Sequence, residues 1–183
     1  HGSDRYRNGV VSTSVRSPLR FTPILKHRAW GGRSLQTLGK TLPDGAPFGE
    51  SWDLADLPTS IDNGRSHVAD GAFAGTSLHD LLDRAERDIL GGVARAETNG
   101  FPLLVKFLDA ADNLSLQVHP NEAYCAAHPG AFPKTEAWFV LHAAAGSKIY
   151  RGVRHDVTPE TFRAAILDGS ALDLMHAIEV NAG

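Results

Sequence analysis

The chain has 183 residues, of which 42% are hydrophobic and 21% are charged, and its formal net charge is -3. These values are typical of one soluble globular domain with a sizeable core. Lys and Arg form no block of like charge, which argues against a nucleic-acid or anionic-membrane partner. A single cysteine excludes an intramolecular disulfide, and no apolar run reaches the roughly 20 residues that span a bilayer. We therefore expect a cytoplasmic protein with no membrane partner.

Both ends of the sequence are unusual for a natural domain. The chain begins at His1, its one methionine is Met175, and it stops within the strand–turn pattern "IEVNAG". These features predict a fragment. Residues 1–19 are polar, basic and non-periodic, which is typical of a flexible tail, so we expect the folded part to be residues 20–183.

Short strands and one clear helix are predicted for the first half of the folded part. Residues 21–55 are broken by Gly and Pro and favour short strands and turns. Residues 76–90 favour a helix that Thr76 or Ser77 caps and that two glycines end. This helix carries His79, for which water is the default partner. The apolar stripe of the helix consists of Leu78, Leu81, Leu82, Ala85 and Ile89.

The second half alternates short strands with short helices. In "FPLLVKFLDAADNLSLQVHP" two strand-like runs flank the turn-forming "DAADN", which predicts a hairpin. A short helix is expected after Pro120, followed by strands in "KTEAWFVLHA" and "SKIYRGV". A helix with Pro159 at its first position then precedes a last strand, "MHAIEV". This pattern is typical of a β-barrel or sandwich that carries helices at one end.

The stretch "LSLQVHP" contains the candidate site. On a strand, Ser115, Gln117 and His119 share one face, because side chains alternate with a period of two. Lys134 and Glu136 share a face by the same rule. A barrel would bring Gln117, His119 and Glu136 together, and their amide, imidazole and carboxylate donors suit zinc or another divalent cation. The residues alone leave a second interpretation open, a solvated strand face with no metal.

Four segments occur in the order found in a known family. They are "PILKHRAWGGRSL", "GESWDLAD", "LLVKFLDAADNLSLQVHPNEAY" and "KTEAWFVL". In these segments the chain resembles the type I mannose-6-phosphate isomerases (phosphomannose isomerases), which are zinc enzymes of the cupin superfamily. The resemblance runs from Pro23 to Gly183. It implies a mainly β fold with inserted helices, a cupin-like β-barrel or jelly roll that is incomplete at the C-terminus.

The resemblance also implies roles for particular residues. The implied ligands of one Zn2+ per active site are Gln117, His119 and Glu136. The implied catalytic residues are Lys134 and Glu136, and the implied contacts to the sugar phosphate are Ser115, Lys106 and Lys134. A further histidine ligand and a catalytic arginine of the family lie on later segments that this chain does not reach. Residues 20–183 would therefore be the N-terminal part of the cupin catalytic domain.

Structural roles stay open for several of these residues. In the structural interpretation, Gln117 hydrogen-bonds to a metal ligand or to water. Lys106 then lies on the solvent-facing side of the hairpin, and Ser115 hydrogen-bonds to a neighbouring strand. Glu50 in "GESW" is interpreted as structural. No activating base stands beside Cys125 in the sequence, so we expect no nucleophile there. The tryptophans interpreted as core anchors are Trp30, Trp52 and Trp138. The histidines without partners at ligand spacing are His27, His67, His79, His128, His142, His155 and His176.

The implied function is an aldose–ketose isomerase that interconverts mannose 6-phosphate and fructose 6-phosphate through an enediol(ate). The alternative is a non-catalytic cupin-like module that binds a metal or a sugar, or an inactive fragment. The expected partner is a small-molecule sugar phosphate. We also expect self-association, because a truncated barrel exposes strand edges and apolar faces. With an incomplete metal shell, the isolated chain should be nearly inactive.

Overall fold

The computed structural model describes residues 14–183, and residues 1–13 of the predicted tail lie outside the described residues. The chain divides into two compact units, of which the first ends at Val118 and the second runs from His119 to Gly183. Residues 14–19 have no regular secondary structure, and the Val15 N–H donates to the Asp88 carboxylate over 2.8 Å. Within residues 14–183 the structure contains no helix with the length and apolarity that crossing a bilayer requires.

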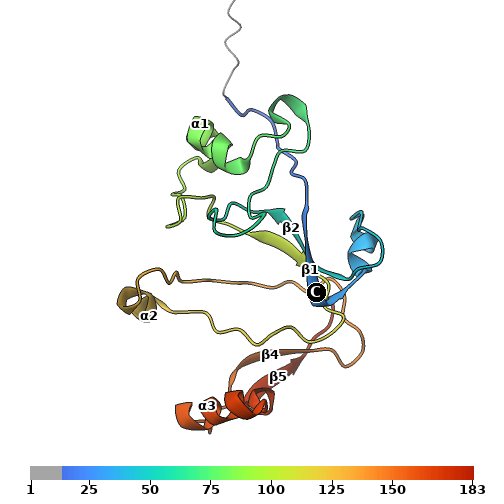
Figure 1. The fold of residues 1–183 in the computed structure, drawn as a ribbon, viewed down its shortest axis with the longest axis vertical. Helices are drawn as coiled ribbons and strands as arrows, with labels where there is room; N and C mark the ends of the chain where they lie inside the picture. Colours follow the sequence, from blue (N-terminus) through green and yellow to red (C-terminus); the bar gives the residue numbers. More distant parts are fainter. Residues whose placement is uncertain (1–13) are drawn as a thin grey trace, which may run out of the picture. The chain divides into compact units, whose positions relative to one another are not determined.

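The first unit is built on a three-stranded antiparallel sheet in the order β1-β2-β3 (Figure 1). Its elements are β1 (Ile24–Gly32), the 3-10 helix η1 (Ser34–Leu38), β2 (Phe48–Leu54), the 3-10 helix η2 (Gly71–Phe73), α1 (Leu78–Leu90) and β3 (Val105–Leu108). The backbones of β1 and β2 approach closely, since a Cβ atom on Gly31 would lie 2.4 Å from the backbone nitrogen of Gly49. Glycine is therefore needed at this crossing of the segments "WGGR" and "GESW".

Helix α1 confirms the helix predicted from the sequence. The Ser77 hydroxyl accepts a hydrogen bond from the Asp80 N–H at 3.1 Å, and Gly91 ends the helix with a φ of 60°. A kink at Ala85, where φ is -144° and ψ is 40°, changes the phase of the apolar stripe in the last turn. The stripe consequently ends on the buried Leu90 rather than on the expected Ile89, which is only partly buried. The buried members of the helix are Leu78, Leu81, Leu82 and Leu90.

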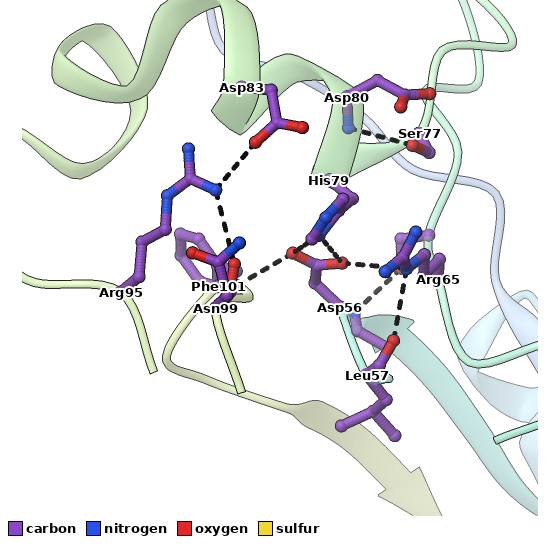
Figure 2. A network of polar contacts seen from close by, with 12 residues as sticks. Asp56, Leu57, Arg65, Ser77, His79, Asp80, Asp83, Arg95, Asn99 and Phe101 are labelled. Atoms are coloured by element: carbon purple, nitrogen blue, oxygen red, sulfur yellow. Dashed lines mark hydrogen bonds and ion pairs between the residues drawn. The ribbon is translucent and has the colours of Figure 1, made fainter. Parts of the chain in front are cut away.

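A buried carboxylate joins the end of β2 to α1 and to the segment before β3 (Figure 2). The Asp56 side chain is fully buried and accepts a hydrogen bond from the Phe101 N–H at 2.9 Å. Its oxygens lie 3.1 and 3.2 Å from His79 Nδ1 and 3.5 Å from Arg65 Nε. The expectation that water is the partner of His79 is thus wrong, because the helix turns this ring toward Asp56. Burial of the charge is offset by donors from three separate segments.

A second buried carboxylate, Glu50, lies on the sheet itself. Its oxygens accept hydrogen bonds from Lys106 Nζ at 3.1 Å, from Arg28 Nη2 at 2.6 Å and from Trp52 Nε1 at 3.2 Å. Burial raises the pKa of Glu50. This effect is outweighed by the hydrogen bond and charge of Lys106, by the charge of Arg28 and by the hydrogen bond of Trp52. The pKa of Glu50 is therefore below its ordinary value of 4.5. Trp52 is 7% exposed, which confirms it as a core anchor beside Ile24 and the rest of its cluster.

The second unit combines a two-stranded sheet with short helices (Figure 1). Its elements are α2 (Glu122–Ala127), β4 (Lys148–Val153), α3 (Pro159–Asp168), the 3-10 helix η3 (Ala171–Leu174) and β5 (Met175–Glu179). β4 and β5 pair in antiparallel fashion. Thr158 caps α3 and Pro159 is at its start, as predicted. The buried apolar residues of this unit are Ala165 and Ala171, so it has little core of its own.

Two predicted strands are wrong. Residues 114–119 and 134–143 have no regular secondary structure, and the hairpin expected around "DAADN" does not form. Among the described residues neither segment has a ladder partner, and an extended segment without one gains no interstrand hydrogen bonds. Their alternating apolar side chains stay exposed, as Val118 at 79% and Phe139 at 74% show. Trp138 is 52% exposed, so its assignment as a core anchor is also wrong.

The fold class predicted from the sequence is confirmed at the level of secondary structure. Short antiparallel strands form both sheets, and helices are inserted between the strands. The helix and strand positions at α1, α2, α3, β4 and β5 agree with those predicted. The fold is therefore mainly β with few helices.

Replacing Asp56 with alanine should destabilise the protein by about 3 kcal/mol. The substitution leaves the partly buried N–H of Phe101 without this acceptor and leaves His79 and Arg65 without the charge that they face. Denaturant unfolding followed by tryptophan fluorescence measures this loss. Asp44→Ala, in an exposed turn of the same unit, is the matched control and should change the free energy of unfolding by less than about 0.5 kcal/mol. Equal stabilities of the two variants would contradict the role assigned to Asp56.

The ionised Glu50 should make the folded state pH-dependent in the acid range. Because its pKa is lower in the folded than in the unfolded protein, its stabilising contribution is complete above pH 4.5 and is lost as the pH falls through the lower folded-state pKa. The free energy of unfolding, measured at several pH values from about 7 down to about 3, should fall less steeply in Glu50→Gln than in the unchanged protein. Glu97→Gln, in an exposed loop, should keep the original slope. An unchanged slope in Glu50→Gln would refute this assignment.

Candidate metal centre and sugar-phosphate site

Three of the predicted site residues come together in the second unit. His119 Nε2 lies 3.4 Å from Glu136 Oε2, and Lys134 Nζ lies 3.1 Å from the same carboxylate oxygen. The Lys134 ammonium is also 3.3 Å from His119 Nε2. The side chains of Glu136, His119 and Lys134 are 20%, 33% and 45% exposed, so the cluster opens to solvent. It brings together an imidazole, a carboxylate and an ammonium group.

The chain between His119 and Lys134, 15 positions long, folds back so that the two side chains meet. The chain turns directly after His119 into α2, where the Asn121 carboxamide caps the helix by accepting from the Tyr124 N–H at 2.8 Å. After α2 a loop with two prolines leads to Lys134. The Trp138 indole N–H donates to Glu136 Oε1 at 2.7 Å, which fixes that side of the carboxylate and leaves Oε2 toward His119.

The geometry of His119 and Glu136 fits a divalent cation. Two ligand atoms at zinc bond lengths of about 2.0–2.2 Å and at a tetrahedral angle lie about 3.4 Å apart. The His119 Nε2–Glu136 Oε2 separation is 3.4 Å, and the Lys134 ammonium contacts both atoms. Within residues 14–183 no three His, Cys, Asp or Glu side chains gather into a metal-binding group. A third protein ligand from these residues would therefore have to be of another type.

The other predicted site residues lie in the first unit. Ser115 and Gln117 are exposed members of the segment 114–118, which has no regular secondary structure. Lys106 lies on β3 and donates to Glu50, with 22% of its side chain exposed. The structure thus groups His119, Lys134 and Glu136. The roles of all six predicted site residues stay predictions.

Sequence reasoning missed Arg28 and the full setting of Glu50. Both carry charge beside Lys106, because Arg28 Nη2 and Lys106 Nζ contact the two oxygens of the Glu50 carboxylate. The signal in the sequence is weak. Lys26 and Arg28 alternate along one strand and Glu50 and Trp52 along another, but only the strand pairing places these side chains together.

Comparison with known proteins shows the family of this chain. Residues 19–137 match the family model for the catalytic domain of type I phosphomannose isomerase. Mannose-6-phosphate isomerase ManA of Bacillus subtilis (strain 168) is 35% identical over 167 residues, which are 91% of this chain and 50% of that protein. Mannose-6-phosphate isomerase of Streptococcus mutans is 36% identical over 168 residues, again 91% of this chain and 50% of the relative. The chain spans about half the length of these curated relatives.

A solved structure agrees with the sequence comparison. The crystal structure of mannose 6-phosphate isomerase from Bacillus subtilis superposes with a TM-score of 0.77 at 30% sequence identity, and the match covers 92% of this chain and 51% of that chain. The matched family region contains every residue of the predicted site, from Lys106 to Glu136. The chain therefore belongs to the type I phosphomannose isomerase family.

Proposed function

We propose that this chain supplies part of the active site of a zinc-dependent isomerase that interconverts mannose 6-phosphate and fructose 6-phosphate. The observation that carries the proposal is the 3.4 Å approach of His119 Nε2 to Glu136 Oε2 beside the Lys134 ammonium. Family membership supports the choice of reaction. Relatives named mannose-6-phosphate isomerase also support it, although this chain covers only half of their length.

The reaction takes a proton from C2 of mannose 6-phosphate and returns a proton to C1. A proton leaves the C2 hydroxyl and another is added to the C1 oxygen, so that substrate and product are isomers. The intermediate enediol(ate) places negative charge on an oxygen, and the transition state leading to it needs a positive or hydrogen-bonding group nearby. The phosphate needs a second cationic group, because it is a dianion near neutral pH.

The residues of this chain divide this work. His119 and Glu136, with the Gln117 amide, would hold Zn2+, which when bound supplies a Lewis acid for the sugar oxygens. Lys134, beside both ligand atoms, would donate a hydrogen bond to the oxygen that gains charge. Ser115 would offer a hydroxyl to the sugar phosphate, and Lys106 an ammonium group.

A second function is favoured by one observation. Residues 14–183 gather no group of three His, Cys, Asp or Glu ligands, and a two-ligand site holds zinc weakly. Taken alone, the chain would then be a non-catalytic module that binds a metal or a sugar. Turnover separates the two functions. The 183 residues by themselves should isomerise mannose 6-phosphate far more slowly than a natural full-length protein that carries them, and equal rates would refute the proposal that the chain is only part of the site.

Removing either zinc ligand should abolish both metal and turnover in that full-length protein. His119→Ala and Glu136→Ala each delete one donor of the pair, so zinc affinity should fall at least about a hundredfold and isomerase activity should fall with it. Zinc content after dialysis and a mannose 6-phosphate isomerisation assay measure the two effects. His142→Ala removes an exposed histidine of the same unit and is the matched control. If His119→Ala kept its zinc and its activity, the proposed metal centre would be wrong.

A further inference from the structure

Three cations and one carboxylate share a face of the sheet in the first unit. Lys26 and Arg28 come from β1, Glu50 and Trp52 from β2, and Lys106 from β3. The strand register places Lys26 opposite Glu50 and Lys106 opposite Trp52, so these side chains meet across the strands. The Lys26 ammonium lies 4.4 Å from the centroid of the Trp52 ring. We call these five residues the cation face.

Burial orders the charges of the cation face. The Glu50 side chain is 8% exposed, whereas those of Lys106 and Arg28 are 22% and 39% exposed. The carboxylate is therefore more buried than Lys106 and Arg28, whereas the Lys26 ammonium donates to the backbone carbonyls of Asp62 and Asn63. With three positive charges and one negative charge, the face has a formal charge of +2 in a chain whose net charge is -3.

Net stability alone accounts poorly for a buried glutamate here. Buried ion pairs contribute little net stability, because the cost of removing both charges from water offsets their attraction. What Glu50 adds is a fixed position for two long side chains. Lys and Arg lose rotamer entropy when they are immobilised, and a partner that already holds them removes this loss from the free energy of ligand binding.

The donors of both cations are only partly used. Lys106 Nζ has three N–H groups and donates one of them to Glu50. Arg28 has five, and it donates to Glu50 and to the His27 carbonyl. The remaining N–H groups lie on partly exposed side chains near one another, and such a pair of cations suits the oxygens of a phosphate dianion.

We propose that Glu50 is a positioning residue, which holds Lys106 and Arg28 on the cation face so that their remaining donors bind the phosphate of a sugar phosphate. The choice of anion rests on the function proposed above. Glu50 itself does not touch the substrate. It fixes where the two cations stand, and its negative charge offsets the repulsion between them.

A charge-only role and a positioning role predict opposite results. Glu50→Gln removes a negative charge, so if only charge mattered, inorganic phosphate would bind more tightly. If Glu50 positions the cations, phosphate should bind about tenfold more weakly despite the more positive face, because misplaced donors no longer converge on the anion. Titration of inorganic phosphate into the 183-residue chain, followed by the Trp52 indole N–H resonance, measures the affinity directly. Equal or tighter binding in Glu50→Gln, or no saturable shift in the unchanged chain, would overturn the inference.

Two further variants complete this experiment. Glu50→Asp keeps the charge but shortens the side chain by one methylene, so it should also weaken phosphate binding, and it decides the question if Glu50→Gln does not fold. Wild-type affinity in Glu50→Asp would overturn the positioning role. Asp44→Asn makes the same change of charge as Glu50→Gln in an exposed turn of the unit, and it should leave phosphate affinity unchanged.

Kinetics separate this inference from the function on which it rests. In an active full-length protein, Glu50→Gln should raise KM for mannose 6-phosphate about tenfold with little change in kcat, as expected for a lost ground-state contact to a non-reacting group. A normal KM would overturn the positioning role alone. Failure of the unchanged full-length protein to isomerise the sugar would overturn the proposed function, while the phosphate titration would still decide whether Glu50 positions the cations.

Discussion

Buried carboxylates have to find their counter-charges within the protein, and this requirement organises the first unit. Asp56 is the point where the end of β2, helix α1 and the segment before β3 meet, since donors from all three surround it. Glu50 does the same for the three strands through Arg28 and Lys106. Each carboxylate would be costly to bury alone, so each forces long-range contacts to form together. The sheet and the helix are thereby held in one arrangement by charge as well as by apolar packing.

Local patterns predicted the helices well because their causes are local. The Ser77 cap, the leucine stripe of α1 and the Thr158-Pro159 start of α3 depend on residues within a few positions of one another. Strands depend on partners elsewhere. The alternation in "LSLQVHP" is a real amphipathic pattern, yet without a ladder partner among the described residues the segment stays extended and unpaired. Periodicity indicates which faces a strand would have but does not supply its neighbour.

The residues of the candidate site also differ in how far the sequence alone predicts them. His119, Lys134 and Glu136 could be named from the sequence because unusual residue types stand in a specific motif, and the structure brings them within 3.1–3.4 Å of one another. Neither Arg28 nor the contacts of Glu50 could be predicted in this way. Lys106 lies 56 positions after Glu50 in the chain, so their contact exists only through the pairing of β2 with β3. Long-range electrostatic partners are the part of a site that a single sequence conceals.

The cation face and the cluster of His119, Lys134 and Glu136 both pair a carboxylate with cationic groups, but the two carboxylates differ in burial. In the cation face the carboxylate is the most buried member and is saturated by donors, so it can act only on the groups that it holds. In the second unit the Glu136 side chain is 20% exposed and lies beside an exposed lysine and a histidine. The Lys134 ammonium there contacts both donor atoms that would bind a divalent cation, and an exposed lysine can move aside at small cost. A saturated, buried carboxylate suits a fixed anion-binding surface, whereas an accessible one suits a centre whose cation exchanges.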